Sequence, residues 1–292
     1  MGKKFLAVFV IAAIGLGGYL FWPKEQGKRQ APPVTEEKKG AAKTEVPKPS
    51  DADKAAKKEA PAPKHEEEVR KSPVKSGTVA LKTEEMPIAG TLTASKVVAL
   101  TFDHSWGNTF TPRILSTLKE NNLKVTFFLM GPWSAQHPDV ARQIVSDGHE
   151  IGSHGFRHEN YGEKTESWIR EDLNKSAAQI KAATGIMPVL FRPPNGHYSA
   201  QSLRITHELG YQSILWNIDS IDWMNPGRDV IIERIMKNLK PGAIILMHAS
   251  DTPQQTADAL PILLGKIKEA GYRIVTVSEL LTKYSEKGIV RD

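Results

Sequence analysis

The sequence predicts an α/β fold in which parallel strands alternate with helices, either as a barrel or as an open doubly wound sheet. First, short apolar runs alternate with longer amphipathic stretches from residue 97 onward. Second, Gly or Pro often stands at the joints between them, as at Gly148, Gly185 and Pro241. Third, polar side chains follow several of the apolar runs. Ligands of such folds bind at the carboxyl ends of the strands, so these polar residues are the site candidates.

Seven apolar runs are predicted to be strands, at residues 97–102, 124–128, 149–153, 189–192, 212–216, 243–247 and 273–277. The amphipathic stretches between them are predicted to be helices, at residues 111–121, 138–147, 165–184, 199–209, 229–239 and 255–270. Runs such as VVALTF are apolar almost throughout, which indicates strands that are buried on both faces. No internal repeat is visible.

The amino-terminal part is predicted to cross a membrane once. Residues 5–22 form an uncharged run of 18 residues, which as a helix spans about 27 Å, close to the hydrocarbon core of a bilayer. Lys3 and Lys4 precede the run, which predicts a signal-anchor in residues 1–22, with a cytoplasmic start and the rest of the chain outside the cell. A cleaved signal peptide is the alternative, although no small-x-small cleavage site ends the run.

The next segment, residues 23–76, is rich in Lys, Glu, Ala and Pro and is predicted to be a disordered tether. It acts either as a spacer that carries a domain into the cell wall or as filler without a binding role. After it we expect an entry segment at 77–95, a domain at 96–283 and a carboxyl-terminal tail at 284–292.

Charge and composition exclude several classes of function. The formal charge is +6, from 39 basic and 33 acidic side chains, and the excess lies before residue 77. The folded part of the chain therefore need not present a basic surface, and we predict no nucleic-acid partner. We also predict no protein partner. The chain has no Cys, so any metal must be held by His, Asp or Glu.

Five predicted strand ends supply acids, imidazoles and a guanidinium to one rim. These residues are Asp103, His104, His154, His158, Arg192, Asp219, Asp222, Trp223 and His248. The spacing of His154 and His158 places both imidazoles on one side of a helical turn, where they can share a cation, although such pairs are often plain surface residues. Asp103 is expected to have a catalytic or ligand role, with a helix N-cap as the alternative.

Two further pairings follow from the residue types. Arg192 precedes two prolines, which fix its backbone, and its guanidinium is suited to hold a carboxylate in place. The alternative, a structural salt bridge, is physically almost the same arrangement. Asp222 near His248 would fix the imidazole tautomer and raise its pKa, which produces an acid for a leaving group. Trp106, Tyr198 and Trp223 are predicted to stack on sugar or to belong to the core.

Five motifs in order resemble the polysaccharide deacetylases with a NodB homology domain, also called carbohydrate esterase family 4. They are TFDH at 101–104, HGFRH at 154–158, RPPNG at 192–196, DSIDW at 219–223 and LMH at 246–248. The resemblance covers residues 96–283. The FDxSWG sequence at 102–107, with RPPNG, is most similar to the PdaB-like sporulation branch of the family.

This resemblance implies a distorted (β/α) barrel of about seven strand-helix units. It implies that Asp103 is the general base, oriented by Arg192, and that His248 is the general acid, oriented by Asp222. It further implies a divalent metal held by His154 and His158. It also implies that the backbone N–H of Asn195 helps to hold the oxyanion.

Position 104 departs from the family pattern, because the second Asp of the usual TFDD motif is a metal ligand and here it is His104. We expect His104, His154 and His158 to form a three-histidine zinc site. The alternative is that the His104 imidazole misses the metal.

The sequence therefore predicts a membrane-anchored, metal-dependent hydrolase that removes N-acetyl groups from an extracellular glycan, with peptidoglycan as the first candidate substrate. A glycan-binding pseudo-enzyme is the alternative from another class. A deacetylase of chitin-like oligomers or exopolysaccharide is the third possibility.

Overall fold

The computed structural model of this chain describes residues 81–292. The predicted membrane span at 5–22 and the predicted tether at 23–76 lie outside the described residues. Within residues 81–292, no helix combines the length and the apolar character that a membrane crossing requires.

One sheet of ten strands forms the centre of the described part. The strands are β1 (Ile88–Thr91), β2 (Val97–His104), β3 (Thr126–Leu129), β4 (Glu150–Ser153), β5 (Leu190–Phe191), β6 (Gln212–Ser213), β7 (Ile218–Asp219), β8 (Ala243–His248), β9 (Arg273–Val275) and β10 (Ile289–Arg291).

Eight α-helices connect or flank these strands in the described part. They are α1 (Thr111–Glu120), α2 (Gly131–Gln136), α3 (Pro138–Ser146), α4 (Glu166–Thr184), α5 (Ala200–Glu208), α6 (Arg228–Asn238), α7 (Thr256–Glu269) and α8 (Val277–Lys283). Four short 3-10 helices complete the described elements: η2 (Thr83–Glu85), η3 (Tyr161–Glu163), η4 (Pro194–Gly196) and η5 (Asp222–Met224).

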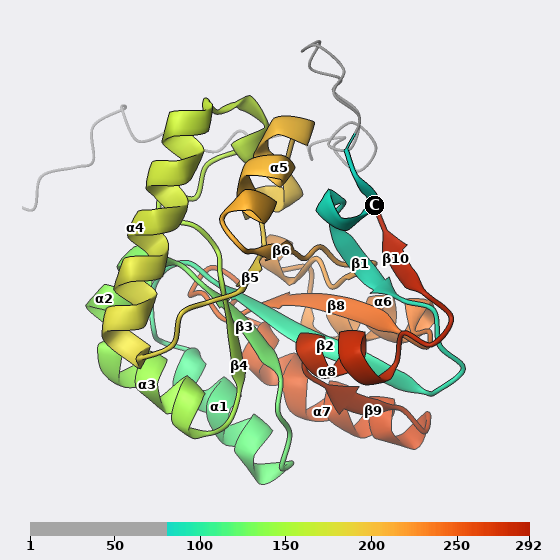
Figure 1. Cartoon of the computed structure of the whole chain (residues 1–292). Coiled ribbons are helices and arrows are strands. Elements are labelled where there is room, and N and C mark those ends of the chain that lie inside the picture. The colour runs from blue at the N-terminus through green and yellow to red at the C-terminus, as the bar shows by residue number, and fades with distance from the viewer. Residues whose placement is uncertain (1–80) are drawn as a thin grey trace, which may run out of the picture. The chain divides into compact units, whose positions relative to one another are not determined.

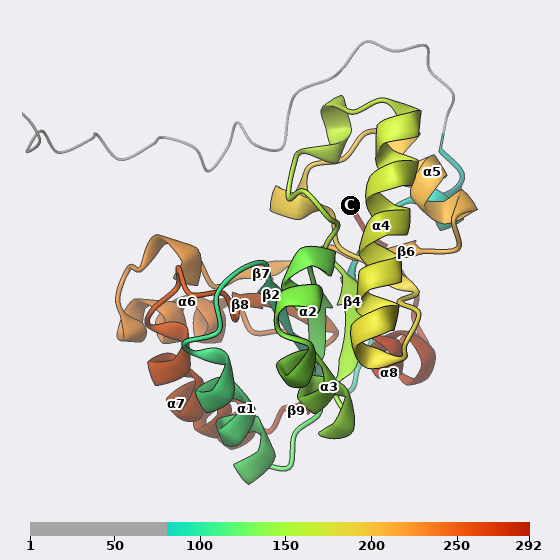
Figure 2. The same ribbon diagram turned by 90° about the vertical axis from the view of Figure 1, so that its left-hand side faces the viewer.

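The sheet curls into a distorted barrel. Its main order is β10-β1-β8-β2-β3-β4-β5-β6, with β7 also paired to β8 and β9 to β2. All pairings are parallel except those of β1 with β8 and β10. A parallel bridge between Ile88 and Ile214 brings β1 back to the chain that follows β6. Figures 1 and 2 show the curled sheet with helices around its outside.

Two hydrophobic cores lie on the two sides of the sheet, and the side chains of β2 alternate between them. Val98, Leu100 and Phe102 belong to the outer core, beneath the helices. Val97 and Ala99 belong to the inner core, inside the curled sheet. This alternation places Thr101 and Asp103 on the inner side, and it assigns His104 to the outer side.

The long helix α4 is bounded by recognisable end signals. Thr165 is its N-cap, and the side chain accepts a hydrogen bond from the backbone N–H of Trp168. Gly185 ends the helix with φ of 80°, a left-handed conformation that glycine adopts at little cost. These signals define where α4 begins and ends, and α4 packs beside the loop that follows β4 and carries His154 and His158.

The distorted barrel that the sequence predicts is confirmed, and each of the seven predicted strands overlaps an observed strand. The six predicted helices coincide with α1, α3, α4, α5, α6 and α7. The sequence did not predict β1, β7, β10, α2 or α8. Strands β1 and β10 come from the predicted entry segment and tail, so the sheet includes residues on both sides of 96–283.

Candidate active site

The predicted polar residues meet at one edge of the barrel, where the parallel strands end. Asp103 lies near the end of β2, and His248 is the last residue of β8. These two residues are register partners on adjacent strands. His154 follows β4, Arg192 follows β5, and Asp222 begins η5. The topology therefore brings together side chains that lie far apart in the sequence.

Arg192 holds Asp103 from inside the barrel. Its Nη1 donates to Asp103 Oδ1 at 2.8 Å and to Thr101 Oγ1 at 2.8 Å. Its Nη2 donates to the carbonyl oxygen of Leu215, and the guanidinium lies 4.2 Å from the centre of the Phe128 ring. Burial alone would raise the pKa of Asp103, but the charge of Arg192 and the hydrogen bond that it donates, together with the charge of His248, outweigh it. The pKa of Asp103 is therefore below its ordinary value, and the carboxylate is ionised at neutral pH.

His154 presents an unprotonated nitrogen to this carboxylate. Its Nδ1 lies 2.9 Å from the carbonyl oxygen of Arg192, and because a carbonyl only accepts, Nδ1 carries the proton. Burial lowers the pKa of His154 to about 4, so the ring is neutral at pH 7. The unprotonated Nε2 atom lies 3.6 Å from Asp103 Oδ2. Two acceptors that face each other in this way favour a cation between or beside them.

His158 lies next to His154, with 5.1 Å between the two ring centres. Its backbone φ is 53°, which is unusual for a residue other than glycine. The Trp106 ring packs against it in an edge-to-face arrangement, with ring centres 5.4 Å apart. The structure thus brings the predicted His154 and His158 pair together beside Asp103, on a loop rather than on a helical turn.

His248 is paired with Asp222 on the opposite side of the site. Its Nδ1 donates to Asp222 Oδ1 at 2.7 Å, and its backbone N–H donates to Oδ2 at 2.8 Å. The hydroxyl of Thr256 donates to the same Oδ2 at 2.6 Å. Burial alone would lower the pKa of His248, but the charge of Asp222 outweighs it and raises the pKa above its ordinary value. With Nδ1 engaged, Nε2 carries the proton that can be given away.

His104 does not join the other two histidines, and this corrects the expected three-histidine site. The imidazole is fully buried, and its ring centre lies 3.8 Å from that of Trp133 on α2. Its Nε2 is 2.7 Å from Thr111 Oγ1, which itself donates to the carbonyl oxygen of Ala249. Burial lowers the pKa of His104 to about 3. The physical reason is alternation along β2, which directs residue 104 to the outer core.

The donor set therefore falls one protein ligand short of a typical catalytic zinc site, which uses three. His154 and His158 face the same space, and Asp103 offers one oxygen that Arg192 does not use. Within residues 81–292, no group of three or more His, Cys, Asp or Glu side chains has the spacing of a metal site. The residues present do not fit the three-ligand centre that the family resemblance implies.

The predicted substrate-binding residues lie around the rim with different partners. Trp106 is 47% exposed, and its Nε1 donates to Thr252. Trp223 is 49% exposed beside Asp222. Asn195 is exposed, has φ of 57°, and donates through its side chain to that of Asn160. Tyr198 donates its hydroxyl to Asp292 at 2.7 Å, so this hydroxyl is already engaged. Sugar contacts by these four residues stay predictions.

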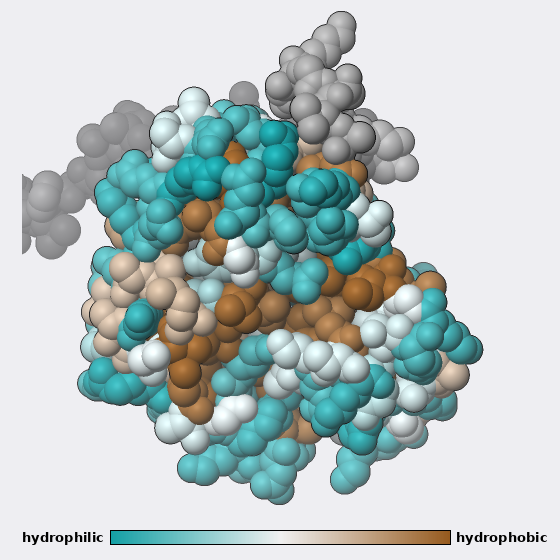
Figure 3. Space-filling view, viewed as in Figure 1, coloured by the Kyte–Doolittle hydropathy of each residue, from teal (hydrophilic) through white to brown (hydrophobic). Residues whose placement is uncertain are grey.

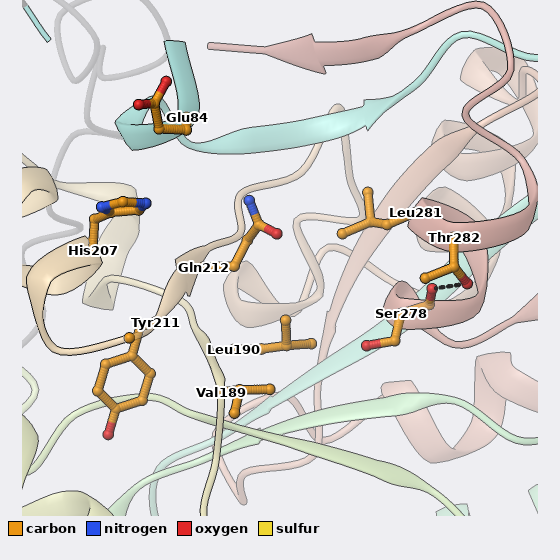
Figure 4. Close-up of a pocket in the computed structure, with 10 residues that line it drawn as sticks. Glu84, Val189, Leu190, His207, Tyr211, Gln212, Ser278, Leu281 and Thr282 are labelled. Atoms are coloured by element: carbon orange, nitrogen blue, oxygen red, sulfur yellow. Dashed lines mark hydrogen bonds between the residues drawn. The ribbon is translucent and has the colours of Figure 1, made fainter. Parts of the chain in front are cut away.

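A separate hollow of about 430 Å³ lies at the opposite ends of the strands. It is lined by the first residues of β5 and β6, Leu190 and Gln212, together with residues of α8 such as Leu281. Figure 4 shows these side chains around it, and Figure 3 shows apolar surface across the middle of the same face. None of the predicted site residues lines this hollow.

Comparisons with known proteins agree with the geometry. A family model described as polysaccharide deacetylase matches residues 91–214. The uncharacterized protein YlxY of Bacillus subtilis is 36% identical over 185 residues, which are 63% of this chain and 57% of that protein. A peptidoglycan-N-acetylglucosamine deacetylase of Bacillus cereus is 37% identical over 193 residues, which are 64% of this chain and 88% of that protein.

Among solved structures, a CE4 family pseudoenzyme from Bacillus anthracis is similar to this chain. It has a TM-score of 0.64 and 36% identity, and the match covers 68% of this chain and 69% of that one. A mutant of that pseudoenzyme, described as having restored enzymatic activity, matches with a TM-score of 0.64 and 38% identity over 68% of this chain and 71% of its own. Because sequence, fold and the five motifs at one rim all agree, the chain belongs to the polysaccharide deacetylase family, carbohydrate esterase family 4.

Proposed function

We propose that this chain is an N-deacetylase that acts on an N-acetylated glycan outside the cell, with peptidoglycan amino sugars as its substrate. One observation carries the proposal: Asp103 and His248 are register partners on the adjacent strands β2 and β8, and each is fixed by its own buried partner. A base and an acid are thereby held next to each other at the carboxyl ends of these strands. The relatives named as peptidoglycan deacetylases support the choice of substrate.

The two residues divide the proton transfers of amide hydrolysis. The Asp103 carboxylate takes a proton from a water molecule as the water oxygen adds to the carbonyl carbon of the acetamide. The backbone N–H of Asn195 is proposed to donate to the oxyanion that forms. His248 Nε2–H then gives its proton to the sugar nitrogen as the carbon–nitrogen bond breaks. The products are acetate and a free amino sugar.

The pKa directions match these roles at neutral pH. Asp103 must be ionised, so activity falls as the pH drops through its pKa, which lies below the ordinary value of 3.8. His248 must be protonated, so activity falls as the pH rises through its pKa, which lies above the ordinary value of 6.5. The active range is therefore expected to include pH 4 to 6.5 and to extend beyond it on both sides.

Asp222→Asn is expected to move only the alkaline limb of this profile. Burial would then act on His248 without the largest opposing charge, that of Asp222, so the limb should move to lower pH. The measurement is kcat/KM for acetate release between pH 4 and 9. Asp219→Asn is the matched control, because Asp219 lies on the same segment and raises the His248 pKa less. An unmoved alkaline limb in Asp222→Asn would show that His248 is not the acid.

Deacetylases of this family are generally metal-dependent, and zinc is the ion that we propose for His154 and His158, because zinc prefers imidazole ligands. Since His104 is engaged elsewhere, we expect His104→Ala to change zinc affinity by no more than about threefold, whereas His154→Ala and His158→Ala lower it by at least about tenfold. Isothermal titration with zinc measures this. Equal losses of zinc affinity in His104→Ala and His158→Ala would show that the His104 imidazole points into the site and binds the metal.

A second candidate function is glycan binding without hydrolysis. The buried, outward-facing His104 favours it, because it leaves the site short of one metal ligand. The similar pseudoenzyme structure is consistent with it. Under this alternative the rim binds glycan, but Asp103 and His248 do not catalyse its hydrolysis.

One experiment separates these possibilities. Purified protein is incubated with peptidoglycan, chitin oligomers or poly-N-acetylglucosamine, with and without added zinc, and both bound glycan and released acetate are measured. Acetate released from peptidoglycan supports the proposed function, and acetate released only from another glycan assigns the substrate to that polymer. Binding without release from any polymer supports the second candidate.

The proposed location is the cell membrane, with the domain facing the wall. It is supported by the apolar run at 5–22 and by Lys3 and Lys4 before it. Membrane fractionation combined with intact mass tests this proposal. A soluble form that starts near residue 24 would indicate a cleaved signal peptide instead.

A further inference from the structure

The loop that carries His158 is held in place by helix α4, through a residue outside all five motifs. Asp172 is fully buried on α4. Its Oδ2 accepts the backbone N–H of Phe156 at 2.7 Å, and its Oδ1 accepts that of Arg157 at 3.2 Å. The hydroxyl of Tyr161 donates to Oδ2 at 2.5 Å. One carboxylate therefore binds both backbone N–H groups that lie between Gly155 and His158.

Ser176, one helical turn further along α4, binds the beginning of the same loop. Its hydroxyl donates to the carbonyl oxygen of Gly155 at 2.9 Å and lies 2.9 Å from the hydroxyl of Ser153. Gly155 has φ of 78°, and a Cβ there would lie 2.9 Å from Tyr161 Oη and 3.1 Å from Asp172 Oδ2. The positive φ and the closeness of Tyr161 on η3 and Asp172 on α4 together mean that position 155 requires glycine.

The conformation of His158 depends on this support. Its φ of 53° is one that residues with a side chain rarely adopt, and such backbones persist when their surroundings determine them. The next residues along the loop give no comparable contact to α4 before Tyr161. The geometry therefore links the carboxylate of Asp172 to the direction in which His158 leaves the loop.

Burying a carboxylate is costly even when a cation is near, which argues that Asp172 does more than fill space. Arg157 forms a long ion pair with it, with Nη1 3.8 Å from Oδ1. Burial raises the pKa of Asp172, while the Tyr161 hydroxyl, the charge of Arg157 and the two backbone N–H groups oppose the rise. A neutral or apolar residue would fill the same space more cheaply but would not bind those two N–H groups.

We propose that Asp172 is a positioning residue, which holds the loop from Gly155 to His158 so that the His158 imidazole faces His154. The effect on turnover rests on the proposed function, whereas the effect on the His158 position does not. A helix outside the five motifs thereby determines the geometry of the second motif.

The test is Asp172→Asn, in which an amide NH₂ replaces one accepting oxygen and faces a backbone N–H. The primary readout is the Cε1–H signal of His158 in ¹H–¹³C spectra, assigned with His158→Gln. This signal is sensitive to small movements, because the rings of Trp106 and His154 lie 5.4 and 5.1 Å away. We expect it to shift, while the signal of His248 stays in place. If the proposed function holds, kcat should fall by at least about tenfold with KM changed much less.

Glu171→Gln is the matched control. Glu171 is the neighbouring acid on α4 and contacts the side chain of the same Arg157, but it binds no backbone group of the loop. It should leave both the His158 signal and kcat unchanged. Tyr161→Phe is a milder variant, which removes one hydrogen bond to Asp172 and should move the signal in the same direction by less.

The outcomes separate this inference from the proposed function. A shifted His158 signal supports the inference even if the wild-type protein releases no acetate, a result that would instead count against the deacetylase. A His158 signal that is unmoved in both Asp172→Asn and Tyr161→Phe overturns the inference, whatever the activity. If Asp172→Asn does not fold, the comparison of Tyr161→Phe with Glu171→Gln decides in the same way.

Discussion

Asp103→Asn is expected to lower the rate of acetate release by at least about a hundredfold while the domain stays folded. The amide cannot accept the proton of the attacking water, yet it has the shape of the carboxylate and can still accept from Arg192. His248→Ala should have an effect of similar size, because the sugar nitrogen is a poor leaving group without a proton. Both are measured as kcat/KM on peptidoglycan at pH 6, with circular dichroism to confirm folding.

The double variant provides an internal check. Residues that act as one unit give far less than additive losses, so Asp103→Asn with His248→Ala should be little slower than either single variant. Asp229→Asn, an exposed acid at the start of α6, serves as the control and should keep full activity. Near wild-type rates in Asp103→Asn or His248→Ala would remove that residue from the proposed mechanism.

Arg192→Met is expected to destabilise the domain by about 3 to 5 kcal/mol, the usual cost of leaving one member of a buried ion pair alone. The variant leaves the Asp103 carboxylate buried without its cation, and it takes a donor from the carbonyl oxygen of Leu215. Urea unfolding followed by fluorescence measures the free energy. Arg192→Lys should also be destabilised, because an ammonium cannot reach Thr101, Asp103 and Leu215 together.

A double-mutant cycle shows whether the ion pair is the cause. If it is, adding Asp103→Asn to Arg192→Met should recover part of the lost stability, because the unpaired charge is then gone. The unfolding free energy of Arg192→Met would contradict the prediction if it lay within about 1 kcal/mol of the wild-type value, the range of ordinary substitutions.

The sequence predicted the longer elements because their patterns are local. A run such as residues 243–247 is apolar on both faces, and α4 carries amphipathic periodicity with Gly185 at its end. Strand β7 has two residues and no apolar run of its own, whereas the equally short β5 and β6 lie within the longer runs at 189–192 and 212–216. Strands β1 and β10 are stabilised mainly by pairing with each other at opposite ends of the domain, and neither segment alone carries that information.

The site was predictable where a motif coincides with a strand end. The pairings of Asp103 with Arg192 and of His248 with Asp222 are both found. His104 was predicted to bind metal because it is a histidine, without regard to its position on β2. Side chains alternate along that strand, so Asp103 points inward and the next residue points outward. The role of Asp172 could not be predicted, because no sequence motif marks a side chain that binds backbone N–H groups of a distant segment.

The pairing of β2 with β8 has a consequence for how this protein becomes active. Asp103 is on the second strand of the described chain and His248 on the eighth, so a nascent chain can fold its first strands without possessing a site. Contacts of such long range close late and slowly. Activity on glycan would thus begin only when nearly the whole domain has emerged and folded, and the rate at which activity returns after denaturant is removed reports the closure of the barrel itself.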